Sequence, residues 1–206
     1  MNIDEPFSEI TIELTDYCPE RCSYCSSRTT TDYYSAKWID FGKVHLFLEC
    51  KHLERIILSG GEPLAHPDFY RILQMAKKHA KDVVVYTNAI THICYNANVI
   101  DGIYVAANLT INDSTAKVKI LKRVDQGRES TRPEVSFSGN FDGRCPCNSP
   151  VMLPDGEIMP SPCNKENETL MKIEDMSRDE LEERVRNLEN YVKTLEMAKY
   201  MKEDDH

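Results

Sequence analysis

The chain has 206 residues, a mass of 23.7 kDa and a formal net charge of −9. This length suits one domain with at most a small appendage, and the acidic balance argues against nucleic acid as a partner because a phosphate backbone attracts basic surfaces. No apolar run is long enough to span a bilayer, and residues 1–8 lack the basic and apolar regions of a signal peptide. We therefore expect a cytoplasmic protein with no membrane partner.

The first two thirds of the chain alternate between strand and helix patterns. Strands are predicted at residues 10–15, 55–58, 83–86, 100–107 and 134–138. Helices are predicted from Asp40 to about residue 52, from Pro67 to about residue 79, and after Asp113 with residues 118, 121 and 124 facing inward. Strands that alternate with helices form parallel βα units. We therefore predict an α/β fold, a compact, partial (β/α) barrel of parallel strands whose active face lies at the strand ends.

The pattern changes after residue 142. Residues 151–153 and 158–159 flank the turn sequence PDGE, which predicts a small β-hairpin. Ser177 and Glu180 form a capping box, and the apolar residues of 181–195 then recur at four- and three-residue spacing, which predicts one helix packed on the barrel. The expected parts are a partial barrel (1–142), a hairpin segment (143–176), and a terminal helix with its tail (177–206).

Eight cysteines are many for a cytoplasmic chain, and in a reducing compartment they are more often metal ligands than disulfides. Six of them form two groups: Cys18, Cys22 and Cys25, and then Cys145, Cys147 and Cys163. The first group follows the first predicted strand with C-x3-C-x2-C spacing. Three thiolates leave one iron of a [4Fe–4S] cube open to a chelating ligand. By themselves they would also suit part of a zinc site.

A glycine strip, GGEP at residues 60–63, directly follows the second predicted strand. The first cysteine group with Tyr24, followed by this strip, resembles the signature of the radical S-adenosylmethionine (SAM) superfamily. The resemblance implies an enzyme in which the three cysteines hold a [4Fe–4S] cluster and SAM chelates the fourth iron. An electron from an external donor then cleaves SAM to a 5′-deoxyadenosyl radical, which abstracts hydrogen from a substrate. Oxygen sensitivity follows from the cluster.

The same resemblance suggests which residues contact SAM. Gly60, Gly61 and Glu62 would meet its amino group, since glycine lets backbone approach a ligand closely. The other expected contacts are Thr87 and Asn88 after the third strand, Asn108 near the ribose, Ser138 near the fifth strand, and Tyr24 on the adenine side. The alternatives are a Gly-Gly turn before a proline and a polar strand end. The sequence identifies no catalytic residue for the substrate.

The second cysteine group resembles the auxiliary-cluster region, of SPASM or twitch type, of many radical SAM enzymes. There, cysteines flank a hairpin with a Pro-Asp-Gly turn, as Cys145, Cys147 and Cys163 do here. The resemblance implies a second iron–sulfur cluster. Its fourth iron would either be open to substrate or be closed by a further residue such as Cys94. A zinc site, which requires four ligands, remains the alternative, with His92 or Cys94 completing it.

These features predict an enzyme that modifies a peptide or a protein-borne residue, because auxiliary clusters of this type often serve such enzymes. Radical rearrangement of a small molecule or nucleotide is the alternative. A non-catalytic iron–sulfur or zinc protein is the alternative from another class, and it would need the cysteines but not the glycine strip. Cys50 is expected to pack in the core, and His66, like the other helix-end histidines, is expected to be solvated or to cap a helix. The sequence does not indicate an oligomeric state.

Overall fold

The structure is a computed structural model that describes residues 8–20, 29–87, 102–105, 118–120, 150–159, 169–174 and 176–203. For residues 102–105, 118–120 and 191–203 it describes the backbone. Among all the described residues, no helix combines the length and apolar character needed to cross a membrane.

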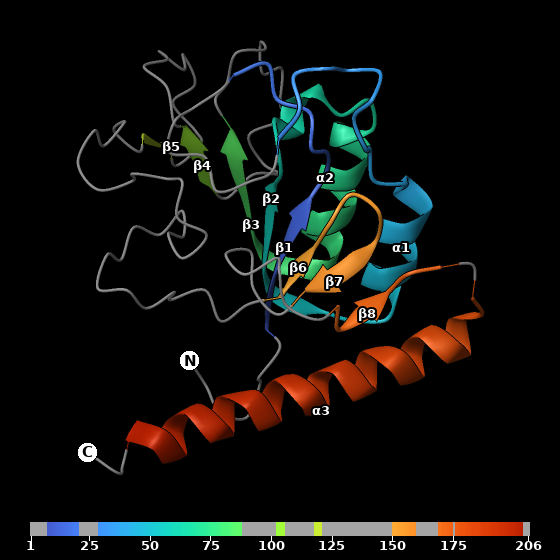
Figure 1. Ribbon diagram of the computed structural model, residues 1–206, viewed down its shortest axis with the longest axis vertical. Helices are drawn as coiled ribbons and strands as arrows, with labels where there is room; N and C mark the ends of the chain where they lie inside the picture. Colours follow the sequence, from blue (N-terminus) through green and yellow to red (C-terminus); the bar gives the residue numbers. More distant parts are fainter. Residues whose placement is uncertain are drawn as a thin grey trace.

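One sheet of eight strands, in the order β5-β4-β3-β2-β1-β6-β7-β8, organises the described residues (Figure 1). The first five strands are parallel neighbours: β1 (Glu9–Glu13), β2 (Leu53–Ser59), β3 (Ala80–Thr87), β4 (Gly102–Val105) and β5 (Val118–Ile120). On the other edge of β1, β6 (Val151–Met152) pairs in parallel, and β7 (Glu157–Met159) and β8 (Met171–Lys172) follow antiparallel. The C-terminal hairpin thus extends the sheet of the barrel.

Two helices connect the first three strands. α1 (Phe41–Glu49) begins at Asp40, whose carboxylate accepts the Lys43 amide as the sequence predicts. α2 (Phe69–His79) follows a short 3-10 helix, η1 (Pro63–Ala65), and begins two residues later than Pro67. Successive right-handed crossovers that proceed in one direction leave their helices on the same face of the sheet. This is the arrangement from which a barrel is built, and it agrees with the fold class that the sequence predicts.

The two faces of β1 differ in chemistry. Ile10 and Ile12 are fully buried in the same core cluster as Val44 and Phe47 of α1. Successive side chains of a strand point to opposite faces, so Thr11 and Glu13 face away from the helices, and both are only 6% exposed. On β1, the face that a barrel turns inward therefore carries buried polar side chains, while the helical face is apolar.

α3 (Arg178–Glu203) lies across the end of the sheet at which the parallel strands begin (Figure 1). Its first turn is capped by Ser177, whose hydroxyl accepts the Glu180 amide at 3.3 Å. Leu181, Val185 and Leu188 are buried and belong to the core cluster. For these three residues the predicted packing of the terminal helix on the barrel is confirmed.

One predicted helix is wrong. The sequence predicts a helix after Asp113, whereas residues 118–120 form β5, paired in parallel with β4. Val118 and Ile120 alternate with Lys117 and Lys119, and this two-residue period is that of a strand with one buried face. The strand predicted at 134–138 lies outside the described residues.

Candidate active site

The pairing of β1 with β2 continues past the ends of both strands. The Leu14 amide donates to the Ser59 carbonyl at 2.9 Å, the Gly61 amide to the Thr15 carbonyl at 2.6 Å, and the Glu62 amide to the Tyr17 carbonyl at 2.7 Å. On the β1 side these hydrogen bonds involve Leu14, Thr15 and Tyr17 in turn, so the last of them lies directly before Cys18. The structure therefore places Cys18 beside the glycine strip, at the edge of the sheet where a parallel α/β fold carries its active site.

The two glycines of the strip are required by its contact with the segment that leads to Cys18. A Cβ atom on Gly61 would lie 2.0 Å from the Tyr17 carbonyl oxygen, and one on Gly60 would lie 2.4 Å from the Thr15 carbonyl oxygen. Gly60 also has a φ of +124°, which side chains other than hydrogen disfavour. The family resemblance predicts that these glycines serve the close approach of SAM. The structure shows a close approach of backbone to backbone.

Glu62 joins the ends of β2 and β3. Its side chain is fully buried, and one carboxylate oxygen accepts the Leu64 amide at 3.0 Å and the Thr87 hydroxyl at 2.5 Å. Hydrogen bonds of this kind offset the cost of burying a carboxylate. Two predicted SAM-site residues, Glu62 and Thr87, are therefore in direct contact, and both lie next to the strip.

Residues 29–38 fold back over the segment before Cys18. The Cys18 amide donates to the Thr30 carbonyl at 2.9 Å, and the Thr30 amide donates to the Asp16 carbonyl at 2.9 Å. The Tyr17 ring stacks on Trp38 with centroids 5.8 Å apart. Residues 29–38 therefore support the backbone of Cys18, the first of the predicted cluster ligands, from the side opposite to the glycine strip.

His66 lies against Trp38, with ring centroids 5.8 Å apart. The sequence predicts that His66 is solvated or caps a helix. The side chain is only 4% exposed, so it is not solvated, whereas the residue does cap η1 at its C-terminal end. Its Nε2 donates to the Ile39 carbonyl at 2.9 Å, and its Nδ1 accepts the Asp68 amide at 3.1 Å. Burial lowers the pKa of His66. His66 is therefore a neutral bridge between the starts of α1 and α2.

The C-terminal hairpin has the predicted turn. Val151 pairs with Met159 across it, and Gly156 takes a φ of +88°. The structure adds that β6 pairs in parallel with β1, Thr11 opposite Val151 and Ile12 opposite Met152. The hairpin that the second cysteine group flanks is therefore hydrogen-bonded to the strand that leads to Cys18.

Glu13 is a buried carboxylate that is not among the predicted site residues. It ends β1 on the face turned away from the helices and is 6% exposed. The signal was present in the sequence, because in ITIELT the glutamate takes the phase opposite to the isoleucines.

Most of the other predicted site residues lie outside the described residues: Cys22, Tyr24, Cys25, Asn88, Cys94, Asn108, Ser138, Cys145, Cys147 and Cys163. Within the described part, Cys18 and Cys50 are both thiols, and no group of three or more histidine, cysteine or acidic side chains could hold a metal ion. Cys50 packs against the core as predicted. Cys18 fits an iron ligand, because it is a thiol, 7% exposed, at a strand end beside a backbone-lined strip.

Comparison with known proteins identifies the family. The model of the radical SAM superfamily matches residues 12–135, which is more than half of the chain. The chain therefore belongs to the radical SAM superfamily, as its two motifs predict. The match begins in β1 and includes Cys18, Gly60 and Thr87.

The chain is similar to curated enzymes over part of its length. It is 34% identical over 84 residues to the PqqA peptide cyclase of Bradyrhizobium diazoefficiens, covering 40% of this chain and 21% of that protein. It is 31% identical over 85 residues to the GTP 3′,8-cyclase of Campylobacter lari, covering 38% of this chain and 26% of that protein. The matches thus span about a fifth to a quarter of these relatives, and both relatives agree with the prediction of an enzyme.

Solved structures confirm the fold class. BtrN in complex with AdoMet and 2-DOIA superposes with a TM-score of 0.54 at 17% identity, over 91% of this chain and 87% of that one. BtrN in an open conformation gives a TM-score of 0.56 at 15% identity. At such identities the likeness concerns the fold alone.

Proposed function

We propose that this chain is a radical SAM enzyme that modifies a peptide, with its SAM cluster held by Cys18, Cys22 and Cys25. The observation that carries the proposal is the continued pairing of β1 with β2, which holds Tyr17, the residue before Cys18, against the glycine strip. When bound, a [4Fe–4S] cluster at these thiolates supplies the electron that cleaves SAM to a 5′-deoxyadenosyl radical. A cytoplasmic location and oxygen sensitivity belong to the same proposal, as does an external electron donor.

The residues of the chain bind and orient SAM at this edge of the sheet. The backbone of Gly60 and Gly61, fixed against the Cys18 segment, presents a rigid strip to the amino group of SAM. The hydrogen bond from Thr87 to Glu62 links the ends of β2 and β3 beside the strip. Tyr24, Asn88, Asn108 and Ser138 remain the proposed further SAM contacts.

A peptide is the favoured substrate because the chain is similar to PqqA peptide cyclases, among them one 38% identical over 81 residues. The similarity to GTP 3′,8-cyclases supports a second candidate, radical rearrangement of a nucleotide or small molecule. The two candidates share the SAM site and differ in what occupies the inner face of the barrel, where Thr11 and Glu13 lie buried.

The second cysteine group is proposed to hold an auxiliary iron–sulfur cluster of SPASM or twitch type through Cys145, Cys147 and Cys163. Cys94 is the proposed fourth ligand, unless that iron is open to substrate. Support comes from the hairpin of β6 and β7, which has the predicted turn and adjoins β1. The proposed boundaries are 1–142 for the barrel, 143–176 for the auxiliary segment and 177–206 for the terminal helix and tail.

The test is formation of 5′-deoxyadenosine by protein reconstituted anaerobically with iron and sulfide, then given SAM and dithionite. Cys22→Ala should abolish it, whereas Cys50→Ala, which changes a thiol packed against the core, should not. Undiminished product in Cys22→Ala would contradict the assignment. Loaded protein that forms no 5′-deoxyadenosine with a PqqA peptide, with GTP or alone would favour the non-catalytic alternative. Stimulation by the peptide or by GTP would separate the two substrate classes.

A further inference from the structure

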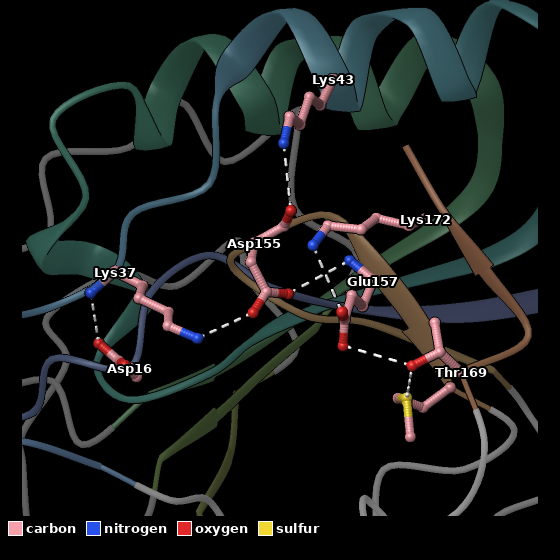
Figure 2. A network of polar contacts seen from close by, with 8 residues as sticks. Asp16, Lys37, Lys43, Asp155, Glu157, Thr169 and Lys172 are labelled. Carbon is pink, nitrogen blue, oxygen red and sulfur yellow. Dashed lines mark hydrogen bonds and ion pairs between the residues drawn. The ribbon is translucent and has the colours of Figure 1, made fainter. Parts of the chain in front are cut away.

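Two lysines of the barrel donate hydrogen bonds to the turn of the C-terminal hairpin (Figure 2). The Lys37 ammonium donates to the Asp155 carboxylate at 2.9 Å, and the Lys43 ammonium donates to the Asp155 carbonyl at 3.1 Å. Lys37 precedes α1 and Lys43 lies in its first turn. Both contacts converge on one residue of the turn, although more than 100 residues separate the partners in the sequence.

Lys37 also holds the segment that leads to Cys18. Its amide donates to the Asp16 carboxylate at 2.7 Å, and its carbonyl accepts the Thr15 hydroxyl at 2.8 Å and the Asp16 amide at 3.3 Å. The Asp16 carbonyl in turn accepts the Thr30 amide, and the Thr30 carbonyl accepts the Cys18 amide. A continuous path of hydrogen bonds therefore runs from Asp155 through Lys37 to the backbone of Cys18.

The ion pair between Lys37 and Asp155 is poorly suited to stabilising the fold as a whole. The Lys37 side chain is 61% exposed and the Asp155 side chain 29% exposed, and ion pairs of this exposure contribute little to stability. Pairing of β6 with β1 and the buried side chains of Met152 and Ile158 already hold the hairpin. The interaction is nevertheless formed. Burial opposes the charge of Asp155, yet the hydrogen bond from Lys37 keeps the pKa of Asp155 below its ordinary value.

We infer that Asp155 is a positioning residue for the SAM-cluster site: through Lys37 it fixes the segment 15–18 that presents Cys18. The inference rests on the proposed function, and it names a role for the hairpin turn that differs from framing the second cysteine group. The hairpin sets the geometry of the first cluster, so displacement of the turn is transmitted to Cys18.

The variants that test this are Asp155→Asn and Lys37→Met, each of which removes the ion pair while conserving size. Lys172→Met is the matched control, because it breaks a lysine–carboxylate pair with Glu157 on the same hairpin (3.4 Å) that does not touch residues 15–18. Amide hydrogen exchange of the reconstituted full chain is followed by mass spectrometry in peptides covering 14–18 and 29–31. The rate of 5′-deoxyadenosine formation and the electron paramagnetic resonance signal of the reduced cluster are measured on the same samples.

The expected result is exchange about threefold to fivefold faster in these peptides for Asp155→Asn and Lys37→Met, with an altered cluster signal and slower 5′-deoxyadenosine formation. Lys172→Met should match the native chain. The double variant should exchange no faster than either single variant, because both remove one interaction.

Native exchange in the Asp155→Asn and Lys37→Met variants would overturn the inference, and so would faster exchange with an unchanged cluster signal. Equal effects in Lys172→Met would also overturn it, since they would indicate loosening of the whole hairpin. Failure of the proposed function appears differently, as absence of 5′-deoxyadenosine from the native chain.

Discussion

Gly61→Ala tests whether the glycine strip is fixed by its contact with the cysteine-bearing segment. Gly61 is the informative position, because the positive φ of Gly60 would add dihedral strain to the steric effect, and the φ of Gly61 lies outside that region. An added Cβ would lie 2.0 Å from the Tyr17 carbonyl oxygen and 2.5 Å from its carbon. Both are backbone atoms, so no side-chain rotation can relieve the contact.

The magnitude follows from the displacement that the methyl group demands. Ordinary van der Waals contact begins at 3.4 Å, so the strip and the segment 15–17 would have to separate by about 1.4 Å. Such a shift takes the Gly61–Thr15 and Glu62–Tyr17 bonds, now 2.6 and 2.7 Å, beyond hydrogen-bonding distance. The two lost hydrogen bonds cost about 1 kcal/mol each, and overpacking costs about 1–3 kcal/mol. Alanine restricts the unfolded chain, which returns a small part of this cost. The free energy of unfolding should therefore fall by about 2–4 kcal/mol.

The assay is urea denaturation of the chain together with its iron content after anaerobic reconstitution. At about 2 kcal/mol per molar urea, the midpoint of Gly61→Ala should fall by about 1–2 M, and less iron should be retained. Gly42→Ala is the comparison: its Cβ would meet only the Asp40 side chain, at 2.8 Å, and this side chain can rotate at the cost of its cap on α1. A lost cap costs about 1 kcal/mol and alanine favours the helix, so Gly42→Ala should lose clearly less stability than Gly61→Ala. The reasoning is refuted if Gly61→Ala stays within about 0.5 kcal/mol of the native chain and retains full iron.

Three further predictions test other parts of the structure. Thr87→Val removes a hydrogen-bond donor from the buried Glu62 carboxylate and should lower the free energy of unfolding by about 1–3 kcal/mol in denaturation. Thr87→Ser keeps the hydroxyl and should be close to native. Equal losses of stability in the two variants would contradict the role of this hydrogen bond. Leu181→Ala should cost about 2–5 kcal/mol by the same measurement, against little for the exposed Glu183→Ala, if α3 is part of the core. The third prediction concerns pH. Burial lowers the pKa of His66 in the folded chain below the ordinary value of 6.5, so the unfolded chain takes up a proton on this histidine more readily. The stability that is present above pH 6.5 is therefore lost as the pH falls below 6.5. The free energy of unfolding of the native chain should therefore fall more between pH 7.5 and 5.5 than that of His66→Gln, and equal slopes would refute this.

Local signals in the sequence predicted much of what positions the site. The Asp40 cap, the Asp-Gly hairpin and the stripe of Leu181 and Val185 each depend on residues close together in the chain, and each is found in the structure. The glycine strip was placed correctly at a strand end for the same reason. These features are specified by spacing and by turn chemistry, which a sequence displays directly.

Contacts between distant segments were not predictable in this way. The contact of Gly61 with Tyr17, the bond from Thr87 to Glu62 and the bridge made by His66 all depend on the register of neighbouring strands and loops, which spacing along the chain does not reveal. The helix predicted after Asp113 failed for a related reason. Inward positions at 118, 121 and 124 fit a helix, but alternation at 117–120 fits a strand, and pairing with β4 decides in favour of the strand.

The position of Cys18 is determined from both sides of β1. Residues 9–13 pair with β2 on one edge, and residues 11–12 pair with β6 on the other. A slip of one residue on either edge would exchange the buried isoleucines for Thr11 and Glu13 on the helical face, so the core resists it. Strand β2 ends in the glycine strip, and β6 leads into the hairpin whose turn holds Lys37. The barrel and the C-terminal segment therefore meet at the same short stretch before Cys18. A change that breaks these contacts, such as Asp155→Asn, is expected to slow the proposed SAM cleavage even where it leaves the remaining cysteines untouched.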